Sequence, residues 1–282
     1  MDINTQPAWS KRQLKRLGQA LLDSAPAPAG CPSYGDVMVW HHELAAEVAN
    51  TIRALDWGLD IPLDVTSRGK THDTLVQKLR RSSSITLDQI QDLAGVRVDG
   101  PFTLRSQTDF ARALAAVVGV DERGMRDMRD TPHSGYRAFH LWVRCPAGRV
   151  EIQIRTEGQS EWANTYERLG DLIGRGIRYG EPARDELSQQ AVDNLHKLSR
   201  NLASIEEVVN LAETAQKFPP HQFRTLLEGR RDIPTEAEAD LRRIIQYLEA
   251  ADDSRDDILE VHREYMSHLR AIRRMIEDLE EV

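Results

Sequence analysis

The sequence has few cysteines and no long apolar run, and each absence excludes a class of protein. Its 282 residues include two cysteines, Cys31 and Cys145, which lie far apart. A disulfide framework and a cysteine zinc site are therefore not expected. No stretch of roughly 18 or more apolar residues occurs, so we expect no membrane span. The first residues are polar and then basic, without the apolar core of a secretory signal, which favours a cytoplasmic protein.

Two other kinds of site are missing from the pattern. The nine histidines contain no set with zinc-ligand spacing, and the adjacent His41 and His42 would point apart on a helix. The glycines at 174, 176 and 180 do not form a dinucleotide fingerprint. Neither a histidine zinc site nor a Rossmann-type site is therefore expected.

Charge is unevenly distributed along the chain. The net charge is −8, and residues 181–282 hold 23 acidic and 14 basic side chains, a net of −9. The preceding part is therefore almost neutral, whereas a general nucleic-acid binder usually has a strongly basic face. Local basic clusters in a neutral region suit a small anionic ligand, and they leave open the binding of one end of an RNA.

Periodicity divides the chain into three parts. Proline and glycine at 26–33 predict a linker between two helices. From 184 onward, apolar residues recur every three or four positions on two long helices, with Pro219 and Pro220 as a break between them. We therefore predict an N-terminal basic helix and linker over 1–34, a folded domain over 35–183 and a helical region over 184–282. The predicted elements before residue 184 are helices at 8–23, 35–55, 71–81, 105–118 and 158–172 and strands at 94–99, 138–145 and 149–155, the last two joined by a three-residue turn.

The first candidate cluster is basic and contains Arg68, Lys70, Thr74 and Lys78. If a helix begins near residue 70, the last three side chains lie four apart on one face. Two ammonium groups and a hydroxyl at a helix N-terminus can hold a polyphosphate, with the arginine at the helix mouth. Taken alone, the same pattern also fits a solvated basic face.

The second cluster surrounds a predicted strand start. Asp92 stands just before the strand, Gly95 allows close approach of a backbone or ligand, and Arg97 lies on the strand. A carboxylate at a strand edge can bind Mg²⁺, which prefers oxygen ligands shared with substrate phosphates. A helix cap by the aspartate and a surface arginine would explain the pattern equally well.

The third cluster lies on the predicted hairpin. Glu151, Gln153 and Arg155 alternate with Val150, Ile152 and Ile154, so the two sets point to opposite sides. On a strand buried on both faces, the polar set would be costly unless it served a site. The preceding segment adds further polar and aromatic groups, namely Tyr136, Arg137 and His140.

In this order and spacing, the clusters resemble the synthetase domain of the RelA/SpoT family, above all the small alarmone synthetases, over roughly residues 40–180. The resemblance implies an α+β fold with a mixed sheet flanked by helices, of the nucleotidyltransferase-like type, followed by C-terminal helices. The matching motifs are R-x-K-x-x-x-S-x-x-x-K at Arg68, Lys70, Thr74 and Lys78 (with threonine for serine), D-x-x-G-x-R at Asp92, Gly95 and Arg97, G-Y-R-S-x-H at 135–140 (with alanine for serine), and E-I-Q-I-R-T at 151–156, followed by Gln159, Trp162 and Ala163.

The resemblance also implies a reaction and a role for each residue. The reaction is transfer of the β,γ-pyrophosphate of ATP to a ribose 3′-hydroxyl, with Mg²⁺ as cofactor. Phosphoryl transfer needs mainly positioning and charge neutralisation, which this set of residues supplies. The implied roles are Arg68 and Arg97 on either side of the adenine, Lys70, Thr74 and Lys78 on the triphosphate, Asp92 and Glu151 on Mg²⁺ with Glu151 also as base, Tyr136 stacked on the acceptor base, and His140, Gln153 and Arg155 on the acceptor or a phosphate.

One departure from the family pattern concerns the acceptor. A lysine before the S-G-Y step, expected to hold the 5′-phosphates of GDP or GTP, is absent, and Pro132 and His133 occupy this stretch. Either Arg126, Arg129 or His133 takes over that role, or the acceptor lacks a 5′-diphosphate, as does the tRNA 3′-CCA end used by toxic relatives. A non-catalytic nucleotide-binding regulator is a third alternative, which the intact Asp92 and Glu151 argue against.

The predicted helices after residue 184 contain no motif, so we expect them to assemble or regulate the protein. The apolar stripes must be covered, either by the chain itself or by another copy of it. The resemblance adds that small relatives often form homo-oligomers, and that a toxic member would have an antitoxin partner. In the tRNA hypothesis, the basic segment 11–16 would be the main RNA contact.

Overall fold

The computed structural model describes residues 2–81, 84–217, 221, 224–225 and 235–280, and its chain divides into two compact units. The first, here called the sheet unit, consists of residues 1–101, 107–128 and 138–156. The second, here called the helical unit, consists of residues 102–106, 129–137 and 157–282. Each unit is described by itself.

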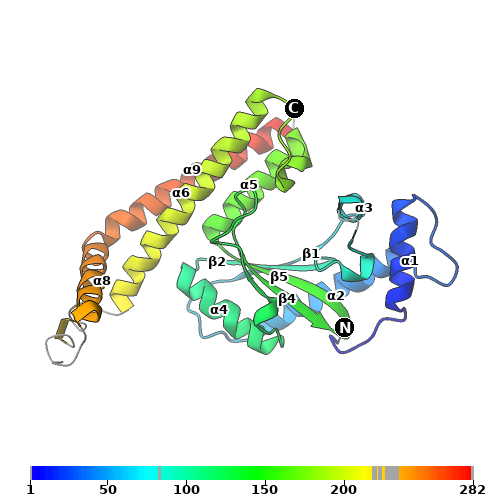
Figure 1. Cartoon of the computed structure of the whole chain (residues 1–282), viewed down its shortest axis with the longest axis horizontal. Helices are drawn as coiled ribbons and strands as arrows, with labels where there is room; N and C mark the ends of the chain where they lie inside the picture. The colour runs from blue at the N-terminus through cyan, green and yellow to red at the C-terminus, as the bar shows by residue number, and fades with distance from the viewer. Residues whose placement is uncertain (1, 82–83, 218–220, 222–223, 226–234, 281–282) are drawn as a thin grey trace. The chain divides into compact units, whose positions relative to one another are not determined.

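The sheet unit is built on a mixed five-stranded sheet with the order β1-β2-β5-β4-β3 (Figure 1). Strand β2 pairs with β5 in parallel and with β1 antiparallel, and the β5-β4 and β4-β3 pairs are also antiparallel. The predicted α+β fold with a mixed sheet flanked by helices is therefore confirmed. The strands are β1 (Asp64–Gly69), β2 (Ala94–Gly100), β3 (Met125–Asp127), β4 (Phe139–Cys145) and β5 (Gly148–Thr156).

One face of the sheet is apolar and forms the core of this unit. Val96, Leu141 and Ile152 lie on this face and are almost completely buried, because every second residue of a strand points to the same side. Figure 1 shows α2 (Tyr34–Ala54) and α4 (Leu104–Val117) on one side of the sheet. The buried Gln107 donates a hydrogen bond of 2.9 Å to the Ile154 carbonyl and so satisfies a polar group inside this core.

The N-terminal helices begin where capping residues predict a helix start. Ser10 caps α1 (Lys11–Leu22) and Ser33 caps α2, each within a capping box. Helices α1 and α3 (His72–Arg81) enclose a second apolar cluster, to which Leu17, Leu75 and the 3-10 helix η1 (Leu87–Gln89) contribute. This cluster fixes α3 close to the start of β2.

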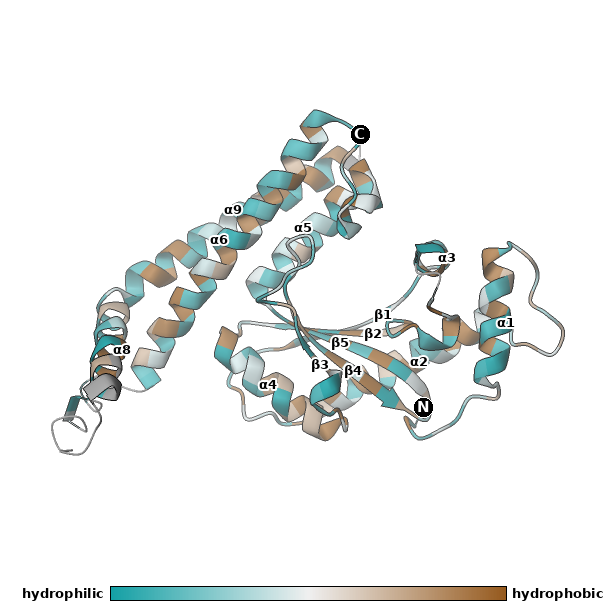
Figure 2. Cartoon of the chain, viewed as in Figure 1, coloured by the Kyte–Doolittle hydropathy of each residue, from teal (hydrophilic) through white to brown (hydrophobic). Residues whose placement is uncertain are grey.

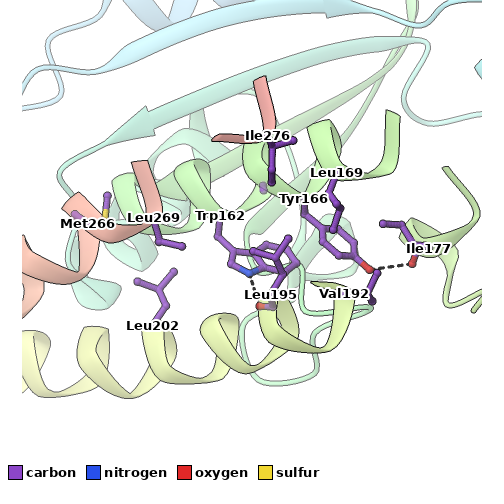
Figure 3. Close-up of a cluster of buried hydrophobic side chains, with 11 residues drawn as sticks. Trp162, Tyr166, Leu169, Ile177, Val192, Leu195, Leu202, Met266, Leu269 and Ile276 are labelled. Carbon is purple, nitrogen blue, oxygen red and sulfur yellow. Dashed lines mark hydrogen bonds between the residues drawn. The ribbon is translucent and has the colours of Figure 1, made fainter. Parts of the chain in front are cut away.

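An apolar cluster, shown in Figure 3, packs α5, η3, α6 and α9 of the helical unit together. Trp162, Leu202 and Leu269 come from three different helices and are each at most 2% exposed. Figure 2 shows hydrophobic residues interrupted by hydrophilic ones along α6 and α9, as expected for amphipathic helices. The elements are α5 (Glu157–Ile173), the 3-10 helix η3 (Arg175–Tyr179), α6 (Glu186–Lys217), α8 (Thr235–Asp253) and α9 (Arg255–Glu280).

Several predicted elements need correction. The hairpin turn contains two residues instead of three, because Gly148 pairs with Cys145 and belongs to β5. Helix α3 begins at His72, so Lys70 precedes the helix. Strands β1 and β3 and helix α8 were not predicted. The break between the long helices was predicted at Pro219 and Pro220, which lie outside the described residues. No helix in the described ranges is both long and apolar enough to cross a bilayer.

Candidate functional site

The second face of the sheet is polar and brings together residues from each of the three predicted clusters. Strand pairing sets Arg68 opposite Gly95, and Gly95 opposite Glu151. Paired residues of neighbouring strands share a face, so these residues form one row across the sheet. The next row contains Thr66, Arg97, Gln153 and His140.

Gly95 permits close approach of β1 and β2 in the first row. A Cβ atom added at Gly95 would lie 3.1 Å from the Arg68 carbonyl oxygen, which is tighter than ordinary packing allows. Arg68 and Arg97 are diagonal neighbours on the same face, a relation that separates them by about 7–8 Å. The predicted pair of arginines is therefore brought together by the sheet.

Asp92 binds both lysines of the first cluster. Lys78 donates a hydrogen bond of 2.7 Å to Asp92 Oδ1, and Lys70 donates one to Asp92 Oδ2. Burial alone would raise the pKa of the Asp92 carboxyl, but the two ammonium groups outweigh it and hold the pKa below its usual value. Asp92 is therefore an anion at neutral pH, and it joins β2 to α3 electrostatically.

Glu151 is a buried carboxylate in the middle of the polar face. Gln153 donates a hydrogen bond of 2.8 Å to Glu151 Oε2, and His140 Nδ1 lies 3.6 Å from Glu151 Oε1. Burial raises the pKa of Glu151, and so does the charge of Asp92, but His140 and Gln153 bring the net shift below the usual value. The influence of Asp92 also means that the two carboxylates interact with each other.

Arg155 forms a buried ion pair. Its Nε and Nη2 atoms each donate a hydrogen bond of 2.8 Å to Asp99, and the side chain is 1% exposed. The two residues are opposite each other in the β2-β5 register. A bidentate pair of this kind holds the guanidinium in place, and no local sequence pattern indicated its aspartate partner.

Thr74 uses its hydroxyl group locally. Its Oγ1 atom donates a hydrogen bond of 2.9 Å to the Thr71 carbonyl and lies 2.9 Å from the Thr71 hydroxyl. The hydroxyl therefore helps to order the first turn of α3. Its predicted contact with a triphosphate stays a prediction.

Tyr136 belongs to the helical unit, in a loop with an unusual backbone. Ser134 and Gly135 have φ values of +48° and +79°, in the left-handed region that glycine adopts without strain. The Tyr136 amide donates a hydrogen bond of 2.9 Å to the His133 carbonyl, and the ring packs against the apolar cluster of this unit. The tyrosine predicted to hold the acceptor base is thus fixed at both its backbone and its ring.

Helix α6 supports this loop directly. Ser199 Oγ donates a hydrogen bond of 2.5 Å to the Gly135 carbonyl and accepts one of 3.3 Å from Arg137 Nε. His196 Nε2 lies 2.9 Å from the Tyr166 hydroxyl, and burial lowers the pKa of His196. A neutral imidazole at pH 7 is therefore packed beside Gly135. The sequence did not indicate His196 or Ser199, because both appear as ordinary polar residues of an amphipathic helix.

Comparison with known proteins agrees with this geometry. Residues 67–168 match the model described as "Region found in RelA / SpoT proteins". These residues form a RelA/SpoT-family synthetase domain. The matched segment contains Arg68, Lys70, Asp92 and Glu151.

Relatives and solved structures cover part of the chain. Uncharacterized proteins of Mycobacterium tuberculosis and Mycobacterium bovis are 52% identical over 181 residues, which is 64% of this chain and 66% of the relatives' length. Small alarmone synthetase 1 from Bacillus subtilis, solved with its product pppGpp, is 22% identical, with a TM-score of 0.47 over 61% of this chain and 93% of that chain. A GTP pyrophosphokinase family protein from Streptococcus pneumoniae is 20% identical, with a TM-score of 0.47 over 65% and 95% of the two chains.

The carboxylates of this RelA/SpoT-type domain fit a magnesium ion. Mg²⁺ is usually held by one or two protein carboxylates together with water and substrate phosphates, without a complete protein cage. Asp92 and Glu151 supply two such carboxylates, and both have a lowered pKa and interact electrostatically. Within the described ranges, no group of three or more histidine, cysteine or acidic side chains gathers as a metal site. This donor set is the one expected when substrate phosphates complete the coordination.

Proposed function

We propose that the chain is an ATP-dependent pyrophosphokinase that transfers the β,γ-pyrophosphate of ATP to the 3′-hydroxyl of GDP or GTP, giving guanosine 3′-pyrophosphates. One observation carries the proposal. Two carboxylates interact at this site, Glu151 on the polar face of a RelA/SpoT-type sheet and Asp92 just before β2, and two lysines bind Asp92. This arrangement combines a metal-binding pair with cations suited to a polyphosphate.

The donor side of the proposal rests on Lys70, Lys78 and the two arginines. Without substrate, both lysines neutralise Asp92. A bound triphosphate offers them more negative charge, which would free the aspartate to bind metal. The diagonal spacing of Arg68 and Arg97 leaves room for one planar ring between two guanidinium groups. These residues therefore suit ATP, as the sequence motif predicts.

The acceptor side of the proposal rests on Glu151. Its lowered pKa keeps the carboxylate deprotonated at neutral pH, so it can take the proton from the 3′-hydroxyl. The 3′-oxygen then bonds to the β-phosphorus while the bond from that phosphorus to the α,β-bridging oxygen breaks, and AMP leaves. Gln153 and His140 orient the carboxylate for this step. When bound at Asp92 and Glu151, Mg²⁺ would neutralise charge on the transferred phosphates.

The experiment is transfer from ATP labelled with ³²P at the γ-position. The purified chain is incubated with Mg²⁺ and with GDP, GTP or deacylated tRNA, and the acceptor that gains the label is identified by chromatography. Label in a guanine nucleotide supports the proposal. Label in none of the acceptors, under conditions where the protein binds ATP, would refute it.

A second candidate, supported by a specific observation, is pyrophosphorylation of the tRNA 3′-CCA end. The loop before Ser134 contains Pro132 and His133 and lacks the lysine that would hold a 5′-diphosphate. A terminal adenosine of tRNA offers no such group, so this loop would suit it. Label in tRNA alone, with none in GDP or GTP, would select this alternative.

A further inference from the structure

Two arginines oppose each other next to Glu151. Arg144 on β4 pairs with Arg149 on β5, two register steps from the pair formed by Trp142 and Glu151 and therefore on the same face. Directly opposed residues have Cβ atoms about 5 Å apart and point to the same face. Both guanidinium groups therefore belong to the polar face that contains Glu151, and neither belongs to the motifs described above.

This like-charge pair lacks a carboxylate partner. Among the residues that the structure describes, no acidic oxygen lies within 4.0 Å of either guanidinium. Burial lowers the pKa of Arg149, and the charge of Arg144 lowers it further, against a weaker opposing effect of Asp88. Like charges directly opposite each other destabilise a sheet, so a folded chain gains nothing from this pair by itself. An anion bound between the two groups would remove the repulsion.

A third cation lies on the same face. Arg126 on β3 stacks over the Trp142 ring, with 4.8 Å between the guanidinium carbon and the ring centroid. Arg126 is likewise without an ion pair among the described residues. Three arginines thus lie on the face that contains Trp142 and a carboxylate assigned to the reaction. Guanidinium groups bind phosphate oxygens in a bidentate manner, and they do so better than ammonium groups.

We propose that Arg144 and Arg149 form a phosphate subsite, which binds a phosphate group of a nucleotide substrate next to Glu151. The inference rests on the proposed function for the presence of a nucleotide on this face. It does not depend on which of the two substrates supplies the phosphate. The subsite would offset the missing lysine of the acceptor loop if the phosphate belongs to GDP or GTP, and would extend the lysine pair if it belongs to ATP.

The test is a comparison of nucleotide binding by calorimetry in the full-length protein with Mg²⁺. Wild type and the Arg144→Gln/Arg149→Gln variant are titrated with ATP, GTP and GMP. The control is Arg112→Gln/Arg123→Gln, which removes the same charge from exposed positions of the same unit. We expect the first variant to lose at least tenfold in affinity for ATP or for GTP, and the control to lose less than threefold.

The pattern of loss identifies the source of the phosphate. A loss confined to ATP assigns the subsite to the donor, whereas a loss for GTP with little change for GMP assigns it to the outer phosphates of the acceptor. Unchanged affinities for both triphosphates, or an equal loss in the control, would overturn the proposal. If the double variant does not fold, the exposed Arg144→Gln alone decides the question.

Calorimetry combined with the labelled-ATP transfer assay separates this inference from the proposed function. If wild type binds the triphosphates but makes no product, and the arginine variant loses that binding, the subsite stands and the proposed function fails. If the arginine variant transfers pyrophosphate with unchanged KM for both substrates, the function stands and the subsite fails.

Discussion

Replacing Gly135 by alanine tests how firmly the loop that contains Ser134, Gly135 and Tyr136, the proposed acceptor loop, is held. Gly135 has a φ of +79°, which costs an L-residue about 1–2 kcal/mol. The new Cβ atom would also lie 2.8 Å from Trp162 Cζ2, 2.9 Å from Cη2 and 3.2 Å from His196 Cδ2. Overpacking of this kind typically costs about 1–3 kcal/mol. The two effects together amount to about 2–5 kcal/mol if the loop keeps its place.

The indole is less able to move than the loop. Trp162 is 2% exposed, donates a hydrogen bond of 2.7 Å to the Leu195 carbonyl and stacks on Tyr166 with 4.9 Å between ring centroids. We therefore expect the loop to shift and to carry Tyr136 with it. The free energy of unfolding should fall by about 2–4 kcal/mol. The KM for the acceptor should rise at least tenfold, with the KM for ATP little changed.

Gly119→Ala is the matched control. Gly119 has a φ of +69°, and nothing lies within 4 Å of the Cβ position, so this change introduces backbone strain without a clash. Urea denaturation and acceptor saturation curves are measured for both variants. Equal losses of stability, together with an unchanged acceptor KM in Gly135→Ala, would show that the loop is not packed against Trp162 in the way described.

Four further predictions concern the carboxylates, the acceptor and the C-terminal helices. Glu151→Gln and Asp92→Asn should each abolish transfer while circular dichroism shows an intact fold; turnover at saturating Mg²⁺ in either variant would contradict the assignment. Tyr136→Ala should weaken acceptor use by about 1–3 kcal/mol and leave ATP binding nearly unchanged, and an equal loss of ATP affinity would move Tyr136 to the donor site. Asp92 has a lowered pKa, so its contribution to stability is present above its unfolded pKa of about 3.9 and is lost as the pH falls through the lower folded value. The difference in unfolding free energy between wild type and Asp92→Asn should therefore shrink below about pH 4. A difference that stays constant with pH would exclude the lysine pairing. Full-length protein should self-associate in sedimentation experiments through its C-terminal helices, and a monomer at every micromolar concentration would end that hypothesis.

Local pattern was enough to predict the polar face of the hairpin. Glu151, Gln153 and Arg155 alternate with buried aliphatic residues, and alternation determines which side of a strand each residue occupies whatever its partners are. The sequence therefore predicted which residues share a face. It did not reveal which residues of the neighbouring strands lie beside them, because that depends on how two strands are aligned with each other.

Three features were not predictable from local pattern. Asp99 lies 56 positions before Arg155, and only the parallel β2-β5 register brings them together. Lys70 and Lys78 were predicted to hold phosphate and Asp92 to hold metal, but the distance between these groups follows from the packing of α3. Strand β1 has no clear apolar alternation, since only Val65 is buried along it.

The long-range contacts of α6 change how the predicted helical region is understood. Leu195, Leu202 and Val209 of its predicted apolar stripe are buried, whereas Leu187 at the start of that stripe is exposed. The polar residues between them carry the additional information, because Ser199 holds the carbonyl of Gly135 and binds Arg137. Removing everything after residue 183 would therefore remove the support of the loop that contains Tyr136. A truncated chain that still bound ATP but no longer used an acceptor would show that this helix completes the acceptor side of the enzyme, whereas a fully active one would show that α6 is dispensable.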